Sequence, residues 1–138
     1  MIIRIVAGFI TSACFGVIFK APKSELLYCG VVGAIGFAVL EITGSAFFAT
    51  VVVAFLSLCF ARFRKNIATI YLVTGIIPYV PGAGIFNTMY YLVFGMGAES
   101  LEAGINTMMT AGSIALGVIF VFSLDKVFVQ VWRRRRGG

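Results

Sequence analysis

Long apolar stretches follow one another along the chain and are separated by short polar segments. They cover about residues 2–19, 26–44, 46–61, 67–97 and 103–124. A helix needs about 20 apolar residues to cross the roughly 30 Å hydrocarbon core of a bilayer, and the third stretch is the one on the short side. The pattern therefore predicts an all-α integral membrane protein with about five transmembrane helices. They form a single domain, 1–138, that ends in a basic tail, 125–138.

The fourth stretch contains an interruption, "GIIPYVPGAGIFN", at residues 75–87. Pro78 and Pro81 each remove a backbone donor and clash with the preceding helical turn. Two glycines, Gly82 and Gly84, then allow backbone angles that other residues avoid. A straight helix over 67–97 would be about 46 Å long, more than the hydrocarbon thickness. We therefore expect this helix to be broken over residues 78–84 by the Pro-x-x-Pro-Gly motif.

Composition and charge agree with a membrane protein. The chain is 61% hydrophobic and 12% charged, whereas about a quarter of the residues of a soluble domain are charged. The net charge is +6, and the basic residues cluster at the ends of the apolar stretches. This placement favours contact with anionic lipid and argues against binding of nucleic acid. Five crossings put ten of the eleven basic residues on one side. We therefore predict the inner (cytoplasmic) membrane, an external N-terminus and a cytoplasmic C-terminus.

The broken helix is the first candidate for a substrate site. Freed backbone groups are tolerated at membrane depth only where protein or a water-filled cavity covers them. The amide end of the second half-helix suits a carboxylate, and the carbonyl end of the first suits a cation or an ammonium group. A proline kink that serves packing is the alternative. The candidate substrate-binding residues are Pro78, Tyr79, Pro81, Gly82, Gly84, Asn87, Tyr90 and Tyr91.

Polar residues within the apolar stretches are candidates for coupling or for lining the path. Glu41 lies inside the second stretch, and a carboxylate at membrane depth is costly unless it is paired or protonated. The alternative is that Glu41 sits at the outer interface of the membrane. The fifth stretch places Asn106, Thr110 and Ser113 on one helical face. The alternative for this face is interhelical hydrogen bonding. The chain has no histidine, and its three cysteines are not spaced as a metal or redox pair. We therefore expect no metal, no cofactor and no enzymatic activity.

The segment "IIPYVPGAGIFNTMYYLVFG", preceded by "ARFRKN", resembles the signature of the threonine/serine exporter family. The segments "FKAPKSELLYCGVVGAIG" and "AGSIALGVIF" fit the small, membrane-only component of that family in the same order. The motif of the family matches Pro78, Pro81 and Gly82 at the break.

The resemblance implies secondary-active export of small amino acids or, in some members, of dicarboxylates, with a proton gradient as the driving force. It also implies a larger multipass subunit, which we expect as a separate chain, with room for several copies of the small one. The expected function is the small subunit of an exporter of small metabolites such as threonine and serine. The alternatives are a subunit of a dicarboxylate (succinate-type) exporter and a non-transporting membrane scaffold.

Overall fold

A computed structural model describes residues 2–136; Met1, Gly137 and Gly138, which belong to the predicted domain and tail, lie outside the described residues. Residues 2–136 form helices and no strand, which confirms the all-α prediction. The elements are α1 (Ile2–Ile18), α2 (Leu26–Thr43), α3 (Ala46–Arg64), α4 (Ala68–Ile76), the 3-10 turn η1 (Ile77–Tyr79), α5 (Gly82–Val93) and α6 (Gly97–Arg136).

Among the described residues, three helices are long and apolar enough to span a bilayer on their own: Leu26–Thr43, Ala46–Arg64 and Gly97–Trp132. The segments Ala68–Tyr79 and Gly82–Val93 make a fourth span if they are counted together. α1 is an apolar helix of 17 residues and corresponds to the first stretch of the sequence.

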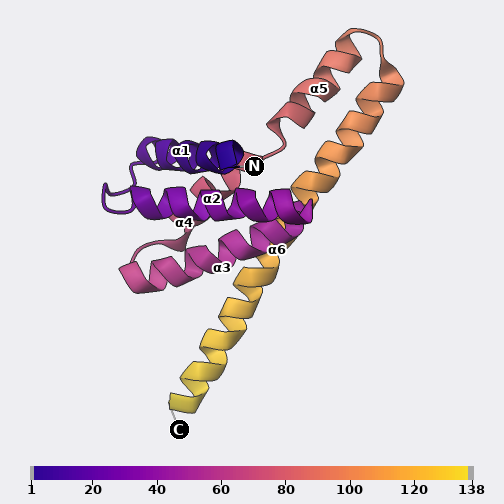
Figure 1. The fold of residues 1–138 in the computed structure, drawn as a ribbon. Helices are drawn as coiled ribbons and strands as arrows, with labels where there is room; N and C mark the ends of the chain where they lie inside the picture. The colour runs from indigo at the N-terminus through magenta and orange to yellow at the C-terminus, as the bar shows by residue number, and fades with distance from the viewer. Residues whose placement is uncertain (1, 137–138) are drawn as a thin grey trace.

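The helices form two parts, a bundle and a projecting hairpin (Figure 1). In the bundle, α2 packs against α1, α3 and α4. α5 and the first half of α6 run antiparallel to each other and extend away from the bundle (Figure 1), while α6 also packs against α3. The N-terminus therefore lies in the bundle, and the C-terminus lies at the far end of α6.

Small residues hold the bundle helices close together. Gly8, Ser12 and Gly16 form the buried face of α1. Across from them, a Cβ atom at Gly33 of α2 would overlap the side chain of Ser12, and one at Gly30 would lie 2.6 Å from the ring of Phe9. Close backbone approach of this kind replaces the hydrophobic driving force that membrane helices lack among lipid tails.

The predicted interruption of the fourth helix at the Pro-x-x-Pro-Gly motif is confirmed, but it is shorter than residues 78–84, because residues 82–84 already form the first turn of α5. The helical backbone ends at Tyr79 and resumes at Gly82, and the two segments make an angle of 44°. Val80 and Pro81 lie outside both helices and link them. Pro78 lies within η1, where it cannot donate a backbone hydrogen bond to the preceding turn.

The last helix is longer than the stretch expected from hydropathy. α6 runs for 40 residues and so includes most of the predicted tail. The sequence from 118 to 136 contains no glycine or proline to end it. At 1.5 Å per residue α6 is about 60 Å long, about twice the hydrocarbon thickness.

Candidate functional site

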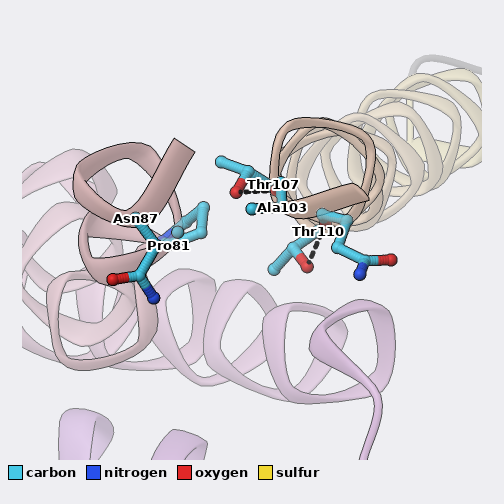
Figure 2. A pocket seen from close by; sticks show the side chains of 7 residues that line it. Pro81, Asn87, Ala103, Thr107 and Thr110 are labelled. Carbon is cyan, nitrogen blue, oxygen red and sulfur yellow. Dashed lines mark hydrogen bonds between the residues drawn. The ribbon is translucent and has the colours of Figure 1, made fainter. Parts of the chain in front are cut away.

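A shallow hollow of about 260 Å³ lies between α5 and α6, and we call it the α5–α6 hollow. Figure 2 shows the two helices facing each other across it. Its lining combines residues from the break with residues from the polar face of α6. The lining residues are Pro81, Gly84, Asn87, Ala103, Asn106, Thr107 and Thr110. The structure thus brings three predicted substrate-binding residues together with two predicted pathway residues.

Glycine opposite threonine sets the spacing of α5 and α6. A Cβ atom at Gly84 would overlap the hydroxyl of Thr107, and one at Gly104 would lie 3.4 Å from the methyl group of Thr88. The hydroxyl of Ser100 donates to the carbonyl oxygen of Thr88 at 2.8 Å and ties the two helices together near their turn. This register places the first turn of α5 beside the polar face of α6.

The donors in the α5–α6 hollow differ in their availability. The hydroxyl of Thr107 donates to the carbonyl of Ala103 at 2.7 Å, and that of Thr110 donates to the carbonyl of Asn106 at 2.9 Å (Figure 2). These hydroxyls are engaged as donors but can still accept. The side chains of Asn87 and Asn106 are exposed, so their amides can both donate to and accept from a ligand.

A second hollow, of about 590 Å³, lies between the break and α1, and we call it the α1 hollow. Two further predicted substrate-binding residues, Pro78 and Gly82, line it. The lining is completed by Arg4, Ala7, Gly8, Thr11, Phe15, Phe37, Ile77 and Val80. Because Pro81 and Gly82 are neighbours in sequence yet line different hollows, the break forms a wall between them.

The three predicted tyrosines line neither hollow. Tyr79 is buried in the bundle, where its hydroxyl lies 3.4 Å from the hydroxyl of Thr50. Tyr90 stacks on Phe86, with ring centroids 6.2 Å apart, and contacts Tyr91 edge-on at 5.8 Å along α5.

The other two predicted pathway residues lie apart from the α5–α6 hollow. The hydroxyl of Ser113 donates to the carbonyl of Met109 within α6. Glu41, in the last turn of α2, accepts a hydrogen bond from Arg4 Nη1 at 2.8 Å. This ion pair joins the end of α2 to the beginning of α1.

Sequence reasoning missed the buried carboxylate of Glu25, which directly precedes α2. Its oxygens accept hydrogen bonds from Arg64 Nη2 at 2.8 Å and from the Tyr71 hydroxyl at 2.6 Å. The Arg64 guanidinium also lies over the ring of Tyr28 at 5.1 Å. The bonds from Arg64 and Tyr71 lower the pKa of Glu25. The position of Glu25 directly before an apolar stretch is a sequence signal for a charge held at the edge of the bundle. Its partners Arg64 and Tyr71 are 39 and 46 residues away in sequence, so the sequence pattern does not identify them.

The profile of the family described as "Threonine/Serine exporter, ThrE" matches residues 4–124. The chain belongs to the threonine/serine exporter family. It is also similar to an uncharacterized protein of Haemophilus influenzae, with 27% identity over 120 residues that cover 75% of this chain and 40% of that protein. The chain thus spans well under half the length of that relative. No solved structure matches.

Proposed function

We propose that this member of the threonine/serine exporter family is the small subunit of a secondary-active exporter of small metabolites such as threonine and serine. The α5–α6 hollow would form part of the substrate path. The observation that carries the proposal is the composition of that hollow, which joins the broken helix to the polar face of α6. Two packed apolar helices have no need of exposed amides beside their contact, whereas a passage for a polar solute uses them.

The chemistry of the α5–α6 hollow suits a small solute with a carboxylate. The first turn of α5 lies at the hollow and has no side-chain cap. The free amides and positive dipole end of a helix N-terminus favour an anionic group. The amides of Asn87 and Asn106 can then hydrogen-bond the remaining polar groups of the solute.

We further propose that a larger multipass subunit covers this hairpin, together with other copies of the chain. No residue of α5 is buried in this structure, and α6 is its main packing partner. Exposed amides at membrane depth are costly when they face lipid, so a protein surface is the expected neighbour. Purification of the tagged chain from its native membrane should therefore yield a second, larger membrane protein. Recovery of the chain alone under mild detergent would contradict this.

Removal of one amide tests the proposed path. Asn87→Ala or Asn106→Ala should each raise the KM for export about two- to twelvefold, because a lost hydrogen bond of about 0.5–1.5 kcal/mol weakens binding by that factor. The assay follows efflux of threonine, serine and succinate from cells that lack the chromosomal gene and carry each variant at equal membrane abundance. Gln130→Ala, which removes an exposed amide elsewhere on α6, is the matched control. Unchanged kinetics in both asparagine variants would exclude the α5–α6 hollow from the path.

The proposed orientation has the N-terminus outside and the C-terminus in the cytoplasm of the inner membrane. Ion pairs join Arg64 to Glu25 and Arg62 to Asp125. The segments before α2, at the end of α3 and in the second half of α6 therefore share one end of the bundle, which we call the basic end. In a cysteine-free background, an impermeant thiol reagent should label a cysteine at Glu99 from outside and spare one at Lys65. The opposite labelling would reverse the orientation.

A further inference from the structure

The ion pair between Arg4 and Glu41 lies beside the α1 hollow: Arg4 lines this hollow, and Glu41 contacts Arg4 without lining it. Arg4 is the single charged side chain among the ten residues that line this hollow, where it accompanies Pro78 and Gly82 of the break. Its Nη1 atom donates to Glu41 Oε1 at 2.8 Å, while 68% of the Arg4 side chain stays exposed. A volume of about 590 Å³ falls in the range of small-molecule sites.

Both partners of this pair keep unused hydrogen-bonding capacity. A guanidinium carries five N–H donors in a planar fork and a carboxylate has about four acceptor positions, whereas the structure gives the pair one hydrogen bond. Arg4 can therefore bind a second carboxylate, and Glu41 can accept from an ammonium group. An α-amino acid carries these two groups on one carbon atom, so it can address two neighbouring side chains of opposite charge.

We propose that Arg4 and Glu41 form a second recognition site for zwitterionic α-amino acids, separate from the α5–α6 hollow, in which Arg4 binds the carboxylate and Glu41 binds the ammonium group. This proposal rests on the proposed function and names the substrate class of the exporter. A dicarboxylate would satisfy Arg4 but would bring its second carboxylate toward Glu41. Arg4 thus attracts a carboxylate of either solute, whereas Glu41 attracts the ammonium group of the zwitterion and repels the second carboxylate of the dianion. Glu41 therefore gives the selectivity between the two classes named above.

The test compares threonine with succinate in single variants of the pair. Cells that lack the chromosomal gene carry wild type, Arg4→Gln or Glu41→Gln, and KM is measured for efflux of each solute. Arg4→Gln should weaken export of both solutes. Glu41→Gln should raise the KM for threonine at least tenfold and leave that for succinate equal or lower, so the preference shifts by at least tenfold. A pair that only joins helices would lower both activities together.

Two controls separate recognition from folding. Arg62→Gln breaks the ion pair with Asp125, which also joins two helices but lines neither hollow, and it should leave the threonine-to-succinate preference unchanged. The double variant R4E/E41R keeps an ion pair between α1 and α2 but reverses its polarity. A structural pair would regain wild-type KM in this variant, whereas a recognition site would not.

The outcomes distinguish this inference from the proposed function. If wild type exports threonine and Glu41→Gln keeps the same preference, or R4E/E41R restores wild-type KM, the recognition site is refuted and export stands. If wild type exports succinate in preference to threonine, the zwitterion site is also refuted. If wild type exports neither solute, the proposed function and this inference fail together.

Discussion

Replacing Tyr71 by phenylalanine removes one oxygen atom from the contact around Glu25 and leaves the aromatic ring in place. The Tyr71 side chain is fully buried, and its hydroxyl donates to Glu25 Oε2 at 2.6 Å. The substitution creates almost no cavity, so the change in the free energy of unfolding reports a single hydrogen bond to a charged acceptor.

The structure sets the size of the effect. A hydrogen bond to a charged group contributes about 1.5–3 kcal/mol. Loss of a whole partner from a buried ion pair would cost about 3–5 kcal/mol, but Glu25 keeps the Nε and Nη2 donors of Arg64. Tyr71→Phe should therefore destabilise the protein by about 1.5–3 kcal/mol at neutral pH.

The pH dependence has a defined sign. Hydrogen bonds from Arg64 and Tyr71 lower the pKa of Glu25 from its ordinary value of 4.5. A carboxylate with a lowered pKa stabilises the folded state above its unfolded pKa, and this contribution is lost as the pH falls through the folded pKa. Without the Tyr71 hydroxyl the folded pKa moves back toward 4.5. The difference in the free energy of unfolding between wild type and Tyr71→Phe should therefore be largest at neutral pH and should become smaller as the pH falls below the ordinary carboxyl pKa.

Equilibrium unfolding of the purified protein in mixed micelles, followed by circular dichroism at several pH values, measures this difference. Tyr28→Phe is the matched control, because Tyr28 contacts Arg64 through the face of its ring, and it should stay within about 0.5 kcal/mol of wild type. Equal stability of Tyr71→Phe and Tyr28→Phe at neutral pH would refute the assigned hydrogen bond. A constant difference at all pH values would refute its dependence on the Glu25 charge.

Two further predictions concern the break and the helix contacts. Alanine at Pro78, Pro81 and Gly82 together should join α4 to α5 and raise helicity, since proline and glycine cost about 3 and 1 kcal/mol relative to alanine in a helix. Threonine efflux should then fall at least tenfold; wild-type efflux with a longer helix would make the break a packing kink. Gly33→Ala should destabilise by about 1–3 kcal/mol through overpacking, since its Cβ would overlap a side chain of α1. Gly112→Ala should stabilise the protein by about 1 kcal/mol, because a Cβ atom at Gly112 would have no neighbour within 4 Å. Equal free energies of unfolding for Gly33→Ala and Gly112→Ala would contradict this packing.

The helices and the break could be predicted from the sequence because they depend on local rules. Stretch length predicts helices in lipid, and two prolines followed by glycine interrupt one of them wherever it packs. The end of α6 was different, because hydropathy falls near Leu124 while helical backbone continues into the arginines. Hydropathy marks where lipid contact ends, and helix propensity decides where the helix ends.

The site could be predicted only in part because it depends on which helix faces which. Asn87 and Asn106 were each recognisable as polar residues in apolar surroundings, but their shared hollow depends on the register of the α5–α6 hairpin. Tyr79 was grouped with the break by its position, whereas its hydroxyl faces Thr50 in the bundle. Glu25 needed Arg64 and Tyr71, and single-sequence patterns carry no information on such distant pairs.

The length of α6 has a mechanical consequence. Its midpoint, Gly117, lies against Thr50 and the backbone of Phe47 in α3, so an arm of about 30 Å extends on each side. A rotation of about 5° around this crossing would move the two ends by about 2.6 Å in opposite directions, and Asn106 by about 1.4 Å. α5 would travel with the arm on which it packs, and the linker at Val80 and Pro81 would take up the motion. A small tilt of the C-terminal arm of α6 would therefore move the linker at Val80 and Pro81, which separates the two hollows, without any change inside a helix.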